Sequence, residues 1–427
     1  MEERKMIYLC LAHMSEDGAE QKYVKEAFDT NWVVPMGPNV NAFEQDLANM
    51  VNSKTDGSEP LDRKVVCLSA GTAAVHLALI ACGVKAGDEV LVQSFTFCAS
   101  SHPITYLGAK PVFVGSERDT WNMDPELLEQ AILDRKAQTG KYPKAIVPVA
   151  LYGMPYDCER IMAIADKYGI PVIEDAAEGM GSRFDGQVLG TFGRFGVLSF
   201  NGNKMITTSG GGALICRNAE DANEIMWYAT QARDAYPYYE HTAIGYNYRM
   251  SNVCAGIGRG QMTVLDDHIA HHKHVQQLYR ELLADVPGVT LHDQPADGRY
   301  DSNFWLCAAT LDPSVRIVGQ ENAYKTVITS AVGGAAGVIK AVDSAVTDCQ
   351  PNENVEALRV FMLDKKVECR PVWKPMHKQP VYADALAYVN GVSEEIFKVG
   401  FCLPAGPYVT DEDVKYIVEC IKEAIVK

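Results

Sequence analysis

Three short segments of the sequence place residues suited to chemistry beside apolar, strand-like runs. The first is Ser69-Ala70-Gly71-Thr72-Ala73-Ala74, which follows the apolar run 65–68. Small residues between a strand and a helix let backbone N–H groups and a hydroxyl approach an anion at the helix N-terminus. The segment therefore predicts a phosphate-binding turn, although an ordinary strand–helix turn that requires a glycine has the same pattern.

The second segment carries three carboxylates at the end of an apolar run. Glu174, Asp175 and Glu178 follow Val172-Ile173, and open α/β sheets bind ligands beyond the carboxyl ends of their strands. A carboxylate at such a place can keep a heterocyclic nitrogen protonated, because a nearby opposite charge favours the charged form. Asp175 is also a good helix N-cap residue, so the segment alone leaves both interpretations open.

The third segment contains a lysine between a strand-like run and a glycine-rich stretch. Lys204 follows 196–203 and precedes Thr207-Thr208-Ser209-Gly210-Gly211-Gly212. Apolar and neutral neighbours favour the uncharged amine, which can form a Schiff base with a carbonyl group. Most isolated lysines are only surface charges, and the order of the three segments distinguishes this one. Asp175 comes about a hundred residues after the phosphate turn, and Lys204 about thirty residues later.

The elements that must position these segments alternate between strand and helix through the first 215 residues. Strand-like apolar runs occur at 65–68, 89–92, 111–114, 145–149 and 171–173. Helical patterns lie between them at 72–82, 124–133 and 160–168, and Asp124-Pro125 suits a helix start. This alternation predicts an α/β domain, with a mostly parallel sheet covered by helices on both faces.

The pattern changes after about residue 250. Residues 255–283 read as one or two long helices, and short strands at 305–311 and 367–372 then alternate with further helices. We expect a large domain over 1–255, with an N-terminal arm, and a smaller C-terminal α/β domain over 256–427. The segment 320–350 contains an apolar, glycine-rich stretch at 327–337. It could be an added helical piece or a flap over the site, and the sequence does not decide between them.

Composition restricts the classes of protein that are possible. The 427 residues carry a net charge of −16, which argues against non-specific nucleic-acid binding. A local group of backbone donors can still bind phosphate in an acidic protein. No run approaches ~18 apolar residues, and the charged N-terminus lacks a signal peptide, so we expect no membrane span and a cytoplasmic location. The 12 cysteines form no Cys-x-x-Cys pair, and we expect them to be reduced and mostly buried.

The order of the three segments, together with further motifs, resembles the DegT/DnrJ/EryC1/StrS sugar aminotransferases, which are pyridoxal phosphate (PLP) enzymes of fold type I. The similar segments, which span nearly the whole chain, are 94–97, 174–178, 201–204, 207–212, 230–233, 239–241, 245–249, 370–377 and 402–404. Within the family they are most similar to the transaminases of bacillosamine synthesis. The resemblance implies a homodimer with shared active sites, which transfers an amino group from L-glutamate to C4 of a UDP-linked 2-acetamido-2,6-dideoxy-4-hexulose.

The same resemblance implies a role for individual residues. Lys204 would form the Schiff base with PLP and later move protons, and Asp175 would hold the pyridine nitrogen protonated, which makes the ring an electron sink. The expected cofactor-binding residues are Gly71, Thr72, Phe97, Asp175, Glu178, Ser199, Lys204 and, from the partner subunit, Asn247. Phe97 would stack on the ring, although a plain core role is also open. Gly71, Thr72, Ser199 and Asn247 would hold the phosphate.

Substrate contacts follow from the resemblance in the same way. The expected residues are Trp32, Glu178, Arg249, Lys374 and His377. Glu178 stands where many relatives have Gln or His, and it would contact either the cofactor hydroxyl or the hexose. The sequence also departs from the family pattern at Ala70, where relatives often have Ser, so one phosphate hydroxyl is missing. The C4 configuration of the product, gluco or galacto, stays open with a preference for gluco.

Other functions compete with this one. His268, His271, His272 and His274 could ligate a metal, but we expect them on the exposed side of a helix and expect no metal. The stretch 333–337 is an imperfect dinucleotide turn without an acidic strand end about twenty residues later, which disfavours a nicotinamide enzyme. A non-enzymatic PLP-binding regulator would need a basic DNA-binding segment, and none is present. PLP-dependent sugar dehydratases lack the lysine. An aminotransferase for another nucleotide-linked keto sugar, for capsule or lipopolysaccharide, is the main alternative.

Overall fold

The computed structural model describes residues 4–55, 57–327, 344 and 346–426. Its large domain is built on a sheet in which two four-stranded pieces, β1-β9-β8-β5 and β14-β3-β2-β4, lie edge to edge. Bridges from Ile146 to Val172 and from Val149 to Asp175 join the two pieces. The strands are β1 (Lys64–Leu68), β2 (Glu89–Gln93), β3 (Lys110–Val114), β4 (Ile146–Val147), β5 (Ile173–Asp175), β8 (Phe195–Ser199), β9 (Gly212–Cys216) and β14 (Ala387–Tyr388). Only β9 pairs antiparallel with its neighbours β1 and β8, so the expected mostly parallel sheet is confirmed.

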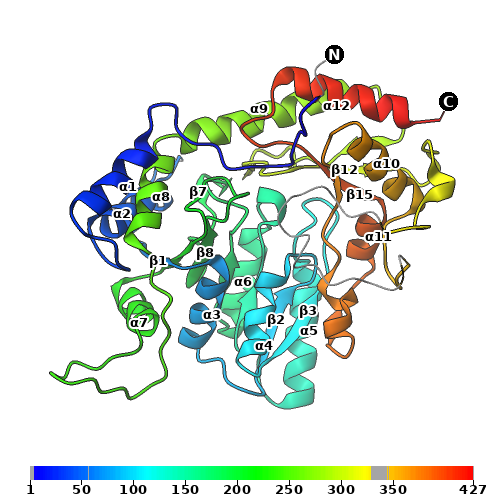
Figure 1. The fold of residues 1–427 in the computed structure, drawn as a ribbon. Coiled ribbons are helices and arrows are strands. Elements are labelled where there is room, and N and C mark those ends of the chain that lie inside the picture. The colour runs from blue at the N-terminus through cyan, green and yellow to red at the C-terminus, as the bar shows by residue number, and fades with distance from the viewer. Residues whose placement is uncertain (1–3, 56, 328–343, 345, 427) are drawn as a thin grey trace.

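Helices cover both faces of this sheet (Figure 1). Within β2, Val90 and Val92 pack into the core with α3 (Gly71–Ala81), α4 (His102–Tyr106) and α7 (Ala219–Ala229). Leu91, on the opposite face, packs with α2 (Pro38–Asn52), α5 (Pro125–Thr139) and α6 (Cys158–Tyr168). A strand that is buried on both faces needs a continuous apolar run, which explains the strand pattern in the sequence. None of the described helices has both the length and the apolar character needed to cross a membrane.

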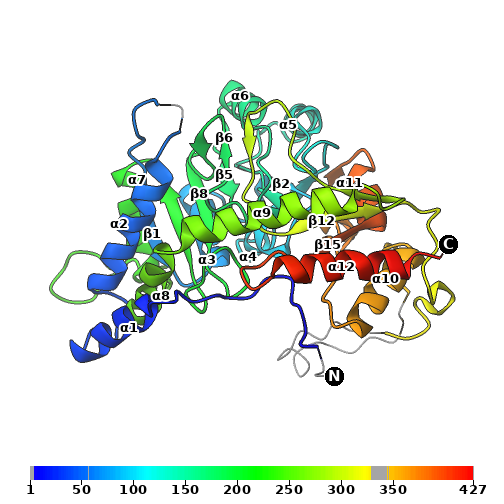
Figure 2. The ribbon, with the colours of Figure 1, turned by 90° about the horizontal axis from the view of Figure 1, so that it is seen from above.

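The smaller domain packs around a second, antiparallel sheet. Strands β10 (Val289–Leu291), β12 (Cys307–Leu311), β15 (Gly400–Leu403) and β13 (Arg370–Pro371) form it in that order. It is covered by α9 (Leu265–Leu283), α10 (Glu353–Asp364) and α12 (Asp411–Ala424), as Figure 2 shows, and α11 (Val392–Val399) lies beside it. A three-stranded sheet joins β6 (Arg183–Phe184) and β7 (Gln187–Val188), which lie between β5 and β8 in sequence, to β11 (Tyr300–Asp301), which follows α9.

The expected boundary at residue 255 does not match a boundary between these two cores. It falls inside α8 (Asn252–Met262), which packs on α1 (Ala19–Asp29) and α2. The next helix, α9, contributes Leu265 to the large core and Val275 to the small one. The division is therefore inside α9, and a helix that spans both cores gives no sequence signal for it. Within the segment 320–350, residues 328–343 and 345 lie outside the described residues, so neither expectation for it is tested.

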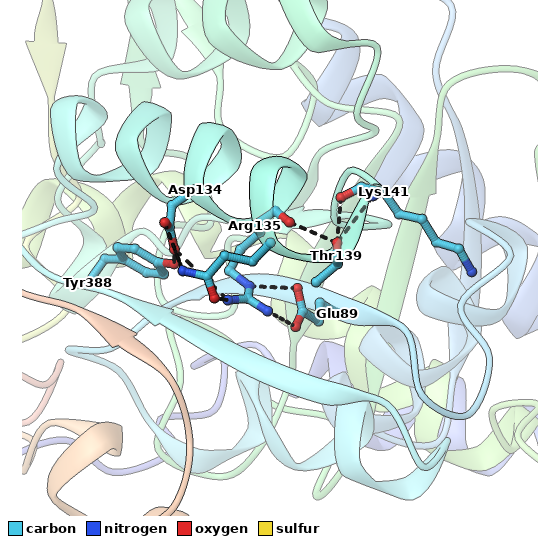
Figure 3. Close-up of polar contacts among 7 residues, drawn as sticks. Glu89, Asp134, Arg135, Thr139, Lys141 and Tyr388 are labelled. Atoms are coloured by element: carbon cyan, nitrogen blue, oxygen red, sulfur yellow. Dashed lines mark hydrogen bonds and ion pairs between the residues drawn. The ribbon is translucent and has the colours of Figure 1, made fainter.

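The C-terminal half also returns to the large sheet. Strand β14 pairs in parallel with β3, and the Tyr388 hydroxyl bonds the Asp134 carboxylate on α5 (Figure 3). On the same helix, Arg135 donates two hydrogen bonds to Glu89 of β2, at 2.9 and 2.8 Å. Two parallel hydrogen bonds between one guanidinium and one carboxylate are among the stronger polar contacts in proteins. It fixes α5 against the sheet where β14 is added.

Two of the four histidines of α9 are buried, contrary to expectation. His268 and His272 are buried, and each bonds a backbone carbonyl through Nδ1: His268 to Met205 at 3.1 Å and His272 to Phe304 at 3.2 Å. His271 contacts the Gly406 carbonyl and His274 the Asp411 carboxylate. The spacing of the histidines is visible in the sequence, but the segments that cover this helix are not. In the part of the chain that the structure describes, no group of three or more His, Cys, Asp or Glu side chains could hold a metal.

His272 should make the protein sensitive to acid. Burial lowers its pKa from 6.5 to about 3, so between these values the unfolded chain binds a proton that the folded chain does not. Stability therefore falls as pH falls through this window, by about 1.4 kcal/mol per pH unit for this ring. From pH 7 to pH 5, we expect the free energy of unfolding to fall by about 2 kcal/mol less in His272→Gln than in the wild type. Urea unfolding at the two pH values measures both losses. An equal loss in both proteins, or an equal benefit from His274→Gln at the exposed end of the cluster, would contradict this assignment.

The cysteines behave as small core residues. All 12 are free, and nine of them are buried. Burial raises the pKa of several thiols, for example Cys10 to about 12. The expectation that the cysteines are mostly buried is confirmed.

Candidate active site

A cavity of about 240 Å³ opens where β5 and β8 end and α3 begins. It lies at the carboxyl ends of parallel strands, the usual ligand position in open α/β sheets. Seven of the residues predicted from the sequence line it, namely Gly71, Thr72, Phe97, Asp175, Glu178, Ser199 and Lys204. Residues as far apart in the sequence as Gly71 and Lys204 thus meet in one cavity, as the order of the three segments predicts.

Lys204 lies in the loop that follows β8, and its side chain is 12% exposed. Its Nζ is 3.2 Å from Oε1 of Glu178 and 3.9 Å from the centre of the Trp305 ring. The other carboxylate oxygen of Glu178 accepts a hydrogen bond from the Tyr152 N–H at 2.8 Å. Burial raises the pKa of Glu178, while Lys204 and this hydrogen bond act in the opposite direction. The lysine is therefore an almost buried cation with one close carboxylate partner.

Asp175, the last residue of β5, has no such direct cation. Its Oδ2 accepts a hydrogen bond from the Ser100 hydroxyl at 2.6 Å, and its Oδ1 accepts one from the Ala177 N–H at 3.2 Å. Burial raises its pKa, although these hydrogen bonds and the more distant Lys204 act against the increase. A protonated ring nitrogen would supply the missing opposite charge. The carboxylate therefore suits a pyridinium group.

The N-terminus of α3 suits a phosphate. Ala70 precedes the helix in extended conformation, and no side chain caps the first turn, so its N–H groups are left for a ligand. Gly71 lies close to β8, because a Cβ there would be 3.2 Å from the Ser199 Cβ. Gly212 on β9 is required, since its Cβ would lie 2.4 Å from the Gly71 nitrogen. With Asp175 and Lys204 across the cavity, these groups fit the phosphate, ring nitrogen and aldehyde of PLP.

Several residues that line or support the cavity were given no role from the sequence. Ser100 orients Asp175 and in turn bonds Thr96 at 2.8 Å between the two hydroxyls. Trp305 and Trp373 form part of the wall. The Tyr152 ring lies parallel to both of these tryptophans, with centroids 6.5 and 6.2 Å away. Tyr152 is buried with φ of +54°, a strained conformation that non-glycine residues adopt rarely and often at functional sites.

Apart from Glu178, the residues expected to hold the substrate do not line this cavity, and neither does Asn247, which was expected at the phosphate from the partner subunit. Trp32 and Asn247 are exposed and do not reach the cavity in this chain. Arg249 is a correction, because its buried guanidinium bonds the Glu44 carboxylate and the Cys67 carbonyl. Two internal acceptors occupy this cation, so it has a structural role here and is not free for a diphosphate.

Lys374 and His377 line a second cavity of about 760 Å³, next to the first. Trp373 lines one cavity and Lys374 the other. The His377 ring is fixed between the Ser94 hydroxyl at 2.6 Å and the Glu394 carboxylate at 2.9 Å. Burial raises the pKa of Glu394. The contacts with His377 and Ser393 together outweigh burial and lower this pKa to about 2. Three lysines, Lys374, Lys378 and Lys398, line this cavity together with Asp348 and Glu394. Lys378 Nζ lies 3.9 Å from Glu394 Oε1.

The fold and the residues of the first cavity define a PLP-dependent aminotransferase of fold type I. Comparison with known proteins gives the particular family. Residues 14–320 and 320–422 match the DegT/DnrJ/EryC1/StrS aminotransferase family, and the chain belongs to it. It is a sugar aminotransferase that acts on a nucleotide-linked sugar, and PLP is its cofactor.

The relatives cover almost the whole chain. EpsN of Bacillus subtilis (strain 168), which carries the name of a PLP-dependent aminotransferase, is 40% identical over 98% of this chain and 95% of its own length. GDP-perosamine synthase of Escherichia coli O157:H7 is 32% identical over 98% of this chain and 99% of its own. A solved DegT/DnrJ/EryC1/StrS aminotransferase from Brucella abortus has a TM-score of 0.78 at 25% identity and covers 95% of each chain.

Proposed function

We propose that the enzyme transfers the amino group of L-glutamate to C4 of a UDP-linked 2-acetamido-2,6-dideoxy-4-hexulose. The product would be a UDP-4-amino-4,6-dideoxy-N-acetylhexosamine of the bacillosamine type, with gluco the preferred configuration. The observation that carries the proposal is the pair of adjacent cavities, one with Lys204 and Asp175 and the other with three lysines. A keto group and a diphosphate on one substrate would need this combination.

Each residue of the first cavity would act on the cofactor or on a proton. Bound PLP supplies the electron sink for the transfer. Lys204 would carry it covalently, and once released its Nζ would move the proton between the cofactor carbon and the substrate carbon that gains or loses the amino group. Asp175 would hold the ring nitrogen protonated. Gly71, Thr72 and Ser199 would bind the phosphate, while Phe97 would lie against the ring and Glu178 beside its hydroxyl or the hexose.

The second cavity would hold the remote part of the substrate. Binding energy from a diphosphate that does not react can position the ketone at the reacting centre. Lys374, Lys378 and Lys398 are the cations available there. His377, which Ser94 and Glu394 orient, would lie on the same side. Trp32 stays a substrate candidate only if a second subunit brings it to the site.

A second copy of the chain would complete the site. Exposed apolar side chains gather in two segments of the large domain: Phe28, Trp32, Val33, Val34 and Met36 near α1, and Tyr236, Tyr238, Tyr239 and Ile244 in the loop 233–247. This loop projects from the domain after α7 (Figure 1), and it ends at the exposed Asn247. Large exposed apolar areas mark interaction surfaces. A homodimer would bury these segments and bring the partner's Asn247 to the phosphate of the opposite site.

Subunit complementation tests this arrangement. Lys204→Ala and Asn247→Ala should each reduce activity strongly, and a mixture of the two should recover part of it, because one site of the heterodimer keeps both residues. The measurement is the transamination rate after subunit exchange, which is followed with a tagged subunit. Absence of recovery despite complete exchange would place Asn247 in its own subunit's site or outside the site altogether.

Substrate preference tests the proposed reaction. We expect kcat/KM to fall strongly for the free sugar and for a 4-keto sugar without the acetamido group, because polar groups arranged for it would lose their partners. The product's structure by NMR gives the amino position and the C4 configuration. A higher kcat/KM with a GDP-linked 4-keto-6-deoxy sugar would favour the second candidate, a perosamine-type reaction, which the 32% identity to GDP-perosamine synthase supports. A simple 2-oxo acid as the best amino acceptor would contradict both.

A further inference from the structure

Trp305 contacts the catalytic lysine without being part of any motif. Its ring centre lies 3.9 Å from Lys204 Nζ, and Glu178 Oε1 lies 3.2 Å from the same atom. The ammonium is thus held between an aromatic face and a carboxylate, both of them buried. An aromatic ring attracts a cation electrostatically, and the attraction grows when water is excluded.

The ring is held in this position by contacts on several sides. Its indole N–H donates to the carbonyl of Asn203, the residue before Lys204, at 2.6 Å. The backbone N–H of Trp305 donates to Asn303 Oδ1 at 2.9 Å, and Asn303 donates to the carbonyl of Glu178 at 2.9 Å. Behind the ring lies Tyr152, whose own N–H bonds the Glu178 carboxylate. The two groups that contact the ammonium are therefore tied to each other.

Helix α9 fixes the same assembly from the small-domain side. His268 bonds the carbonyl of Met205, which follows Lys204, and His272 bonds the carbonyl of Phe304, which precedes Trp305. The backbone is therefore held on both sides of Lys204, by Trp305 at Asn203 and by His268 at Met205. These backbone contacts restrict where the Lys204 amine can lie when it is not bonded to the cofactor.

We infer that Trp305 is a positioning residue for Lys204: its ring, together with the Glu178 carboxylate, fixes the location of the free lysine ammonium. This inference rests on the proposed role of Lys204. A lysine that is released from the cofactor and then moves a proton must return each time to one place near the reacting carbon. The ring and the carboxylate supply that place. The free amine then stays oriented toward the cavity instead of turning to solvent.

The test measures the lysine itself and needs no turnover. The full-length enzyme, freed of cofactor, is treated with acetic anhydride between pH 6 and pH 11, and mass spectrometry quantifies labelling of the Lys204 peptide. Because the ring favours the ammonium, Trp305→Leu should shift the labelling midpoint to lower pH by about half a unit to one and a half units. Trp305→Phe keeps an aromatic face and should stay near the wild type. Trp373→Leu, in the wall of the same cavity, should leave the midpoint unchanged.

A second variant covers the case in which Trp305→Leu does not fold. Trifluorotryptophan at position 305 keeps the shape and the indole N–H but weakens the negative ring face, and it should shift the midpoint in the same direction. Unchanged midpoints in the folded Leu or fluorinated protein would overturn the inference. So would a shift in Trp305→Phe as large as in Trp305→Leu, because the lost hydrogen bond to Asn203 would then be the cause. These labelling results do not depend on the sugar, so a failed substrate assignment leaves them intact.

Discussion

Lys204→Ala is expected to lower the rate of amino transfer by about three to four orders of magnitude, because it removes both the covalent attachment and the proton carrier. The wild-type protein should be yellow, and borohydride should fix PLP on Lys204, where peptide mass spectrometry can locate it. The variant should lose this covalent link while the cavity still binds cofactor. The geometric basis is that Lys204 is the lysine that lines the cavity of Asp175, within the described residues.

Lys167→Ala is a matched control, since Lys167 is an exposed lysine of the same domain that pairs with Glu129. It should keep both the colour and the rate. A Lys204→Ala protein that turns over near the wild-type rate would show that another residue carries the cofactor. So would a borohydride adduct that maps to any other lysine.

Asp175→Asn is expected to reduce kcat by about a hundredfold to a thousandfold, the usual cost of removing one preorganised electrostatic group. The same change should make the cofactor-free chain more stable at neutral pH. Burial raises the pKa of Asp175, so the folded chain binds this proton more tightly than the unfolded chain does. The ionised carboxylate therefore destabilises the fold above its unfolded pKa, and the penalty grows as pH rises through the folded value.

Two measurements check this pair of effects. Thermal unfolding without cofactor should give a higher midpoint for Asp175→Asn than for the wild type at pH 7, and the difference should shrink toward pH 4. Rate measurements at saturating concentrations of glutamate and keto sugar should show the reduced kcat. A variant that is less stable than the wild type at pH 7 without cofactor would mean that the carboxylate is a structural acceptor for Ser100 and Ala177. Wild-type kinetics in Asp175→Asn would contradict the proposed contact of Asp175 with the ring nitrogen.

The sequence predicted the parts of the fold and site that depend on local pattern. Alternating strands and helices gave the sheet, and Asp124 caps α5 as its position before Pro125 indicates. The cavity residues came from motifs in which a small or charged residue ends a strand. The roles of Lys204 and Asp175 stay predictions, but their common cavity is a property of the structure.

Features that depend on contacts between distant segments were missed. Trp305 reaches Lys204 from the segment that follows α9, and Tyr152 reaches Glu178 from the loop that follows β4. Neither residue has a local signature in the sequence. Arg249 was expected at the substrate because of its motif, but Glu44 and the Cys67 carbonyl bind it. The buried histidines of α9 were expected to be exposed, because periodicity alone does not reveal what covers a helix. The division at 255 stays a prediction, because α9 contributes to both cores and gives no sequence signal for a boundary.

Strand β14 has a consequence for biosynthesis of the chain. It completes the edge of the large sheet next to β3, yet it lies at Ala387–Tyr388, more than 270 residues later in the sequence. Until the ribosome has released this segment, a nascent large domain would expose β3 as an unpaired hydrophobic edge, the kind of surface that recruits other chains into aggregates. The large domain therefore matures only after translation is almost finished, and proteins truncated before residue 387 should accumulate in inclusion bodies.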